Sequence, residues 1–527
     1  MNTAEWLSRG VSRLLPAASQ IRNMAAAPVE HAPTAINTGV NAGPTTAAQF
    51  SGSGTASAEL RLASAPASSL TPASTSADST AQRTLHERLT GTLRHKDEAL
   101  SPRLLRRTLT QLQAVLDSQV SEVEGGRRAS EFAQWYASAS PAERRDCWLL
   151  MSEQFAPDPD IIEAARSHYA AAQNTPDAGH AEISLRRALV SPRSRLLQRF
   201  AAFPQGLQFL LDLRTQLLAH LKTEKRLLAL DGELENLFFS WFDVAFLELR
   251  RISWDSPASL IEKLIKYEAV HDIRGWADVK NRLDSDRRCY GFFHPQLPNE
   301  PLIFVEVALL DKLPSAISPL LDEAAAADDL RKATTAIFYS ISSTQTGLRG
   351  VSFGDSLIKR VVETLQAEFP RLRTFATLSP MPGFRSWLGK NVAAMLALLD
   401  DKTRAALGRA VGAAPVGPAD LLAAAEQAPT LDATSPVRHF LMQCAAHYLG
   451  RELVRGKPLD PVTRFHLSNG ARVERLNWGG DLSNKGFKQS YGMMVNYLYD
   501  LKRLDRYRAQ FANSKLAVSS EIETLGF

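Results

Sequence analysis

One stretch of the sequence, residues 334–384, constrains the fold of this chain more than any other. It contains an apolar run that ends near Ser342, a glycine-containing loop, an amphipathic pattern over 355–369 and a β-branched run over 374–378. This order predicts a strand–helix–strand unit, whose crossover connection makes the two strands parallel. A further apolar run at 302–309 predicts another strand, so we expect a sheet with helices packed against it.

The predicted loop carries Gly347, Gly350 and Gly354 and leads directly into the predicted helix. Glycines let a backbone approach a ligand closely, and the free N–H groups of a helix N-terminus attract phosphate. Ser379 follows the second strand, so it and the loop lie at the carboxyl ends of parallel strands, where open α/β sheets bind ligands. The unit therefore predicts a site for a phosphate-bearing small molecule.

Two regions precede this unit. Residues 1–84 consist mainly of Ala, Ser, Thr and Pro, and they predict a disordered tail because they carry too little apolar surface to offset the entropy of ordering. An organelle-import segment over 1–30 is a weaker alternative for the start of that tail. Residues 85–250 show leucines at three- and four-residue spacing, which predicts a helical bundle with a role in oligomerisation. We expect the catalytic domain to occupy 251–527.

Charge and cysteine usage argue against several classes of protein. The 61 basic and 56 acidic residues are spread along the chain, whereas a nucleic-acid-binding protein usually gathers its basic residues in a stripe. No apolar run approaches the roughly 18 residues of a membrane span. The three cysteines are far apart and odd in number, which is typical of reduced thiols. These features favour a cytoplasmic protein with a small anionic ligand.

Four blocks of the sequence resemble the signatures of the malonyl-CoA decarboxylase family and occur in that family's order. They are YSISSTQTGLRGV with FGDSLIKRVV (within 339–362), LSPMPGF (378–384), FHLSNGA (465–471) and LNWGGDLSNKG (476–486). The resemblance implies an α+β or α/β multidomain protein, with an N-terminal all-α helical bundle followed by a mixed-sheet catalytic domain similar to the GCN5-related N-acetyltransferase fold. It also implies that the substrate is malonyl-CoA and that the products are acetyl-CoA and CO₂.

The same resemblance implies roles for particular residues. Ser379 and His466 match the family's catalytic serine and histidine; His466 would protonate the enolate carbon, and Ser379 would bind the malonyl group or accept a proton from it. No metal or organic cofactor is expected, because the thioester carbonyl itself accepts the electron pair. The implied substrate-binding residues are Arg349, Gly350, Val351, Ser352, Phe353, Gly354, Asp355, Ser340 and Tyr499. Ser352 stands where the family often carries a glutamate, so an active-site hydrogen bond is expected to differ here.

Several interpretations stay open at this stage. An acyl-CoA N-acyltransferase would share the predicted fold and CoA loop, and a non-catalytic CoA-binding scaffold would share the helical bundle. A serine hydrolase is disfavoured, since the chain has no GxSxG motif and a proline follows Ser379. Asn477 and Asp481 are candidates to hold His466 in place, and His271 is interpreted as a structural histidine. The sequence leaves the oligomeric state undetermined, although the family resemblance favours a homo-oligomer.

Overall fold

The computed structural model describes residues 100–117, 119–351 and 356–525. The predicted disordered tail over 1–84 and the import segment over 1–30 lie outside the described residues. Within the described part of the chain, no helix is long and apolar enough to cross a membrane.

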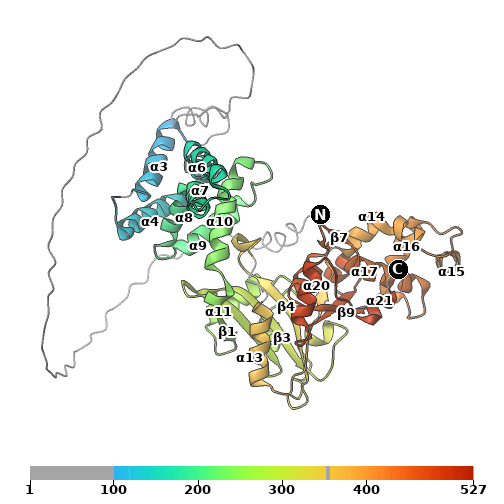
Figure 1. Ribbon diagram of the computed structural model, residues 1–527. Coiled ribbons are helices and arrows are strands. Elements are labelled where there is room, and N and C mark those ends of the chain that lie inside the picture. Colours follow the sequence, from blue (N-terminus) through green and yellow to red (C-terminus); the bar gives the residue numbers. More distant parts are fainter. Residues whose placement is uncertain (1–99, 118, 352–355, 526–527) are drawn as a thin grey trace, which may run out of the picture. The chain divides into compact units, whose positions relative to one another are not determined.

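The described chain from Pro102 to Phe246 is helical (Figure 1). Serine and aspartate side chains begin most of these helices: those of Ser101, Ser140 and Asp158, for example, accept hydrogen bonds from N–H groups of the first turn, and a proline follows each. Such a cap stabilises a helix by about 1 kcal/mol. The helices are α3 (Pro102–Val115), α4 (Glu122–Ser138), α5 (Pro141–Glu153), α6 (Pro159–Ala172), α7 (Ala178–Leu189), α8 (Pro192–Ala201), α9 (Gly206–Leu217) and α10 (Leu228–Trp241), with the short helices η1 (Lys225–Leu227) and η2 (Val244–Phe246).

A mixed sheet of eight strands follows among the described residues. Its strands are β1 (Glu248–Ile252), β2 (Arg287–His294), β3 (Leu297–Leu310), β4 (Thr335–Ser343), β5 (Thr374–Thr377), β6 (Ser379–Pro380), β9 (Arg472–Asn477) and β10 (Met494–Leu498). The order is β1-β2-β3-β4-β5-β10-β6, with β9 also paired to β10. The β4–β5 pair is parallel, and the other recorded pairs are antiparallel.

The remaining helices surround this sheet or extend beyond its β9–β10 end. They are α11 (Ala258–Tyr267), α12 (Trp276–Arg282), α13 (Ser356–Glu368), α14 (Phe384–Ala397), α15 (Asp401–Val411), α16 (Pro418–Ala425), α17 (Pro436–Gly450), α18 (Pro461–Ser468), α19 (Asn484–Ser490), α20 (Leu504–Ala512) and α21 (Ser520–Leu525). Short helices η3 (Ser318–Leu320), η4 (Thr346–Leu348) and η5 (Ala428–Thr430) and a small hairpin, β7 (Leu453–Val454) with β8 (Lys457–Pro458), complete the described chain.

The predicted fold class, a helical bundle followed by a mixed-sheet domain, is confirmed. The predicted strands at 302–309 and 335–342 lie in β3 and β4, the one at 374–378 corresponds to β5, which ends at Thr377, and the predicted helix corresponds to α13. The parallel pairing of β4 with β5 is also as predicted.

Strands β4 and β5 stop pairing just before the predicted site. The last pair in their register is Phe338 with Thr377. Beyond it the chain of β5 passes to β6, where Ser379 pairs antiparallel with Val495 of β10. The register of β4 against β3 also shifts at this level, next to Glu306. Pro380 and Pro382 carry no backbone N–H group for a longer ladder, and β6 is only two residues long.

The loop that follows β4 packs against the helical region. The buried Arg214 of α9 donates to the carbonyl oxygen of Gly347 at 2.8 Å and pairs with Asp231 of α10. A Cβ atom at Gly347 would lie 2.4 Å from the carbonyl oxygen of Leu211, so this position needs glycine for helix packing. The first glycine of the predicted ligand loop thus has a structural role, and one apolar core runs from the helices into the sheet.

Candidate active site

The structure brings Ser379 and His466 together, although 87 residues of sequence separate them. The Ser379 Oγ atom lies 3.3 Å from Nε2 of His466. Both residues are buried, with 6% and 3% of their surfaces exposed. Ser379 comes from β6, at the point where β4 and β5 part, and His466 comes from α18. A nucleophile, acid or base in this position would act in a medium that excludes most water.

Helix α18 is anchored firmly by a buried aspartate. Asp460 is its N-cap, and its carboxylate accepts hydrogen bonds from the backbone N–H groups of Val462 and Thr463. The hydroxyl of Tyr448 also donates to this carboxylate, at 3.1 Å. Burial raises the pKa of Asp460, and these hydrogen bonds oppose the rise. The cap therefore holds the start of the helix that carries His466 in one position.

Two tyrosines hold the His466 ring itself. Its face stacks on Tyr497 of β10, with ring centroids 4.5 Å apart. Its Nδ1 atom lies 2.8 Å from the hydroxyl of Tyr499, just after the same strand. Burial raises the pKa of Tyr499, so the hydroxyl keeps its proton and can donate it to Nδ1. Nε2 then carries the imidazole proton and faces Ser379, whose own hydroxyl donates to Thr377 Oγ1 at 2.8 Å.

Burial lowers the pKa of His466 to about 3, so the folded protein keeps this imidazole neutral at physiological pH. A neutral imidazole whose N–H group points at the reacting atoms can still act as an acid or electrophile. The pair thus offers one hydroxyl and one imidazole N–H at the same point.

This shift predicts acid sensitivity. The unfolded chain protonates its histidine near pH 6.5, whereas the folded chain resists protonation down to about pH 3. The stabilisation is therefore present above about pH 6.5 and is lost as the pH falls toward 3. Between pH 6.5 and 5 we expect His466 alone to cost about 2 kcal/mol of unfolding free energy. Urea unfolding of the wild type and of His466→Gln at both pH values measures this loss. An unfolding free energy that changes equally with pH in the two proteins would contradict the prediction.

The predicted site residue Ser340 lies in a second polar cluster. Its hydroxyl is 2.8 and 2.9 Å from the two carboxylate oxygens of Glu268, at the end of α11. The same carboxylate accepts from the backbone N–H of His271 and from the hydroxyl of Ser342. The Ser340 proton is thus engaged by Glu268, and a role for Ser340 in substrate binding stays a prediction.

Asn477 and Asp481, which were expected to hold His466 in place, form hydrogen bonds with other groups. Asn477 donates to the side-chain oxygen of Asn496 at 2.8 Å, and Asp481 accepts from the backbone N–H of Ser483. Tyr497 and Tyr499 hold the ring in their place. The family resemblance already pointed to Tyr499, and its i, i+2 spacing from Tyr497 is the sequence signal that could have identified Tyr497, since such residues share a face.

The predicted CoA loop is described only in part. Arg349 and Gly350 are exposed and Val351 is buried, whereas Ser352, Phe353, Gly354 and Asp355 lie outside the described residues. Gly350 has a φ of +89°, a backbone conformation that favours glycine. The described chain resumes in α13, so the loop does lead into a helix, as predicted.

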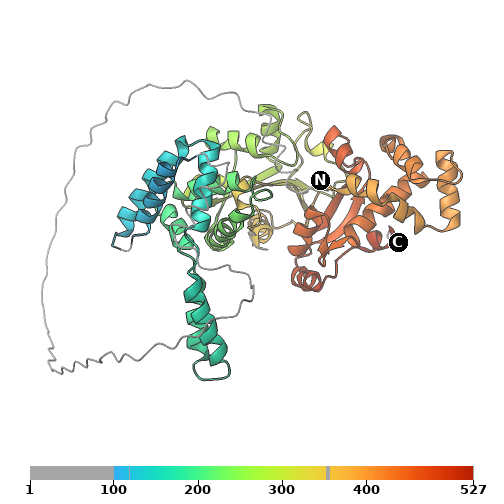
Figure 2. The same ribbon diagram turned by 90° about the horizontal axis from the view of Figure 1, so that it is seen from above.

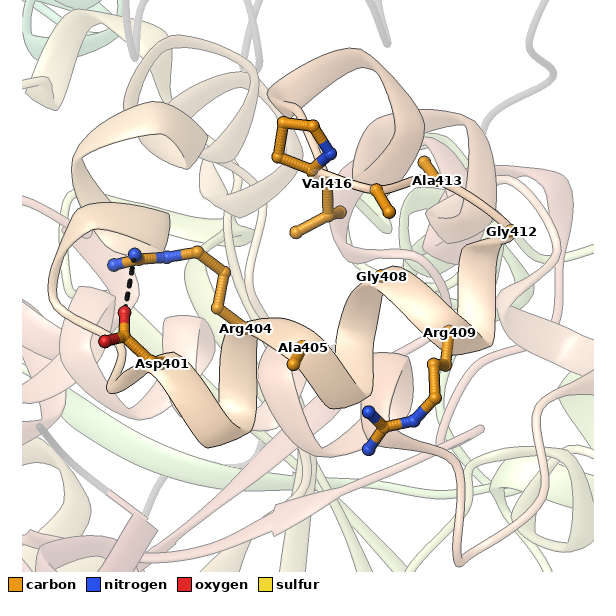
Figure 3. A pocket seen from close by; sticks show the side chains of 10 residues that line it. Asp401, Arg404, Ala405, Gly408, Arg409, Gly412, Ala413 and Val416 are labelled. Atoms are coloured by element: carbon orange, nitrogen blue, oxygen red, sulfur yellow. Dashed lines mark hydrogen bonds and ion pairs between the residues drawn. The ribbon is translucent and has the colours of Figure 1, made fainter.

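Hollows on the described surface include a large pocket beside α15 and a small crevice beside α13. A pocket of about 520 Å³ is formed by α15 and the turn that follows it, around Arg404, Gly408 and Val416 (Figure 3). Its walls are mainly apolar, and the one ion pair drawn in it (Figure 3) joins Arg404 to Asp401. Neither Ser379 nor His466 lines this pocket. A much smaller crevice is lined by α13, Tyr499 and α20. The small crevice thus reaches Tyr499, which contacts His466, whereas neither Ser379 nor His466 lines either hollow.

The chain thus combines a helical region with a mixed sheet, and a buried serine–histidine pair lies where two parallel strands part. These features are typical of a multidomain enzyme. The family model for the malonyl-CoA decarboxylase C-terminal domain matches residues 245–525, and that for the N-terminal domain matches residues 155–242. The chain therefore belongs to the malonyl-CoA decarboxylase family.

Individual relatives agree with this placement. The mitochondrial malonyl-CoA decarboxylases of Anser anser anser and Rattus norvegicus are 34% and 33% identical, over 75% and 79% of this chain and 82% and 89% of their own lengths. The crystal structure of malonyl-CoA decarboxylase from Rhodopseudomonas palustris has a TM-score of 0.69 at 39% identity, and covers 80% of this chain and 99% of its own. That from Cupriavidus metallidurans has a TM-score of 0.65 at 43% identity, with coverages of 80% and 100%.

Proposed function

We propose that this protein decarboxylates malonyl-CoA to acetyl-CoA and CO₂, with Ser379 and His466 at the reacting group. The single observation that carries the proposal is the 3.3 Å separation of these two buried side chains in a chain that belongs to the malonyl-CoA decarboxylase family. Relatives named malonyl-CoA decarboxylase are more than 30% identical to this chain over 75–80% of its length.

The chemistry needs little beyond positioning and aimed hydrogen bonds. When the C–C bond to the carboxylate breaks, its electron pair moves into the thioester carbonyl and leaves an enolate of acetyl-CoA. A buried site removes water from the carboxylate, and one hydrogen bond aimed at the developing oxyanion contributes about 3–4 kcal/mol. In this proposal the Ser379 hydroxyl turns from Thr377 toward the malonyl group when substrate enters.

The Nε2–H of His466 then delivers a proton to the enolate carbon. The hydrogen bond to Tyr499 and the stack on Tyr497 support this role, because they orient Nε2 toward Ser379. A proton donor placed in this way contributes about 10²–10⁴-fold to a rate. At the other end of the substrate, Arg349–Asp355 and the start of α13 would hold the CoA pyrophosphate, as a helix N-terminus does for phosphate.

Incubating the purified protein with malonyl-CoA alone tests the function. We expect acetyl-CoA and CO₂ in equal amounts, without any amine acceptor or added metal. Product formed only when an amine is supplied would favour an N-acyltransferase. Binding of CoA without any turnover would favour a scaffold protein, and either result would overturn the proposal.

We also propose that the protein forms homo-oligomers through its helical region. The α6–α7 hairpin (teal in Figure 2) exposes Ile161, Ile183 and Leu189, and the structure buries only one alanine in each of its two helices. Exposed apolar side chains gathered on one element are typical of a surface that another chain covers. A cytoplasmic location stays a prediction.

This surface gives a direct test. We expect the double substitution of Ile161 and Ile183 by glutamate to lower the apparent mass in light scattering, because it places charges where apolar side chains would pack. Leu398→Glu, at an equally exposed leucine that ends α14, is the matched control and should leave the mass unchanged. An unchanged mass in the double variant, or a wild type that is already monomeric, would contradict the proposal.

A further inference from the structure

Thr377 lies next to the serine of the proposed active site. The Ser379 hydroxyl donates to Thr377 Oγ1 at 2.8 Å, whereas Nε2 of His466 lies 3.3 Å from the same serine oxygen. Thr377 is completely buried, with 0% of its surface exposed. The mechanism proposed above turns the Ser379 hydroxyl toward the malonyl group, which breaks its bond to Thr377. The serine oxygen then needs another hydrogen bond to keep its position beside His466.

Strand β10 holds Thr377 in place through two hydrogen bonds that involve side chains. The backbone N–H of Tyr497 donates to Thr377 Oγ1 at 3.2 Å. The side-chain amide of the buried Asn496 donates to the carbonyl oxygen of Thr377 at 2.8 Å. The recorded backbone pairs of β10 with β5 and with β6 lie on either side of this point. Neither of the two bonds involves Ser379, so Thr377 keeps its position when the serine hydroxyl turns.

The hydroxyl of Thr377 can change its role without losing its other contacts, because a hydroxyl donates one hydrogen bond and accepts two. In the structure Thr377 Oγ1 accepts from both Tyr497 and Ser379. Once the Ser379 proton points to the malonyl group, the Thr377 proton can donate to Ser379 Oγ across the same contact. Ser379 then accepts from Thr377 in place of the imidazole, and the Nε2–H of His466 is free to reach the enolate carbon.

We propose that Thr377 is a positioning residue whose hydrogen bond to Ser379 reverses when substrate binds; this rests on the proposed decarboxylation. In the substrate-free protein Ser379 donates to Thr377. With malonyl-CoA bound, Thr377 donates to Ser379, and Ser379 donates to the malonyl group. The reversal keeps Ser379 Oγ in place, and the hydrogen bond that it accepts makes the serine O–H a stronger donor. Hydroxyl protons only change direction, so no covalent bond forms or breaks in this step.

Thr377→Val tests this role, because valine keeps the shape of threonine but neither donates nor accepts. We expect kcat for malonyl-CoA decarboxylation to fall about tenfold, with KM and CoA affinity unchanged. Thr377→Cys, whose thiol is only a weak donor and acceptor, should show the same loss, and Thr377→Ser should restore the rate. Thr335→Val, at a buried threonine that begins β4, is the matched control and should keep the wild-type rate. Wild-type kcat in Thr377→Val or Thr377→Cys would overturn the proposal, even if urea unfolding shows a loss of stability.

A double-substitution cycle with Ser379 separates positioning from an independent contribution. In single turnovers with enzyme in excess, we expect Ser379→Ala to slow decarboxylation about 100-fold. Adding Thr377→Val should slow it no further, because the serine through which Thr377 acts is gone. Losses that multiply to about 1000-fold would show that Thr377 acts independently of Ser379 and would overturn the positioning role. A wild type that does not decarboxylate malonyl-CoA refutes the proposed function itself, whereas an active wild type with an unaffected Thr377→Val variant refutes only the role of Thr377.

Discussion

His466→Ala is expected to lower kcat for malonyl-CoA decarboxylation by about 10²–10⁴-fold, the contribution typical of a positioned acid. The imidazole is the buried group that presents an N–H toward Ser379 in our assignment, and alanine leaves nothing in its place. The rate loss should appear in single turnovers, because the missing step is the protonation of carbon. CoA should still bind, since its predicted contacts lie in the loop before α13.

The matched control for this prediction is His439→Ala, which removes an exposed histidine of α17 and should keep the wild-type rate. Isothermal titration with CoA separates loss of chemistry from loss of binding. A His466→Ala variant with near wild-type kcat would show that another group protonates the enolate. A variant that no longer binds CoA would show that the histidine acts on binding or folding instead.

Arg282→Met is expected to lower the free energy of unfolding by about 3–5 kcal/mol. Arg282 is 1% exposed and pairs with two buried carboxylates, Asp278 at 2.6 Å and Glu306 of β3 at 2.8 Å. It also donates to the carbonyl oxygen of His271, in the loop that carries Glu268 and so reaches Ser340. Methionine fills a similar volume but leaves both carboxylates buried without their cation.

Urea unfolding followed by fluorescence measures this loss. Arg331→Met is the matched control: Arg331 also pairs with an aspartate, Asp329, but its side chain is 87% exposed, so the change should cost well under 1 kcal/mol. A similar small loss for Arg282→Met would show that the buried carboxylates take up protons or rearrange at little cost.

The sequence was sufficient for those parts of the fold that depend on local pattern. The strand–helix–strand unit from β4 to β5 follows from apolar periodicity, and the structure reproduces it with the parallel pairing expected. Ser379 and His466 were singled out by family signatures rather than by periodicity. Their approach to each other depends on β6 and α18 meeting through β10, and a single sequence contains no signal for such a long-range meeting.

The parts that could not be predicted are contacts between distant segments. Ser340 donates to Glu268 across 72 residues, and Gly347 is required by Leu211 of a helix far upstream. Glycine in a loop is compatible both with ligand approach and with helix packing, so the sequence alone could not assign Gly347 to packing. The sequence places Asp460 before a proline but gives no sign of its burial, and in the structure this buried aspartate anchors the helix that carries His466.

A crystal structure with a malonyl-CoA analogue that cannot lose CO₂ tests the central claim most directly. We expect the malonyl end to lie within hydrogen-bond distance of both Ser379 Oγ and His466 Nε2, with the CoA pyrophosphate at the start of α13. A malonyl end bound elsewhere, for example in the pocket beside α15, or a side chain of the protein filling the space beside Ser379, would contradict the account.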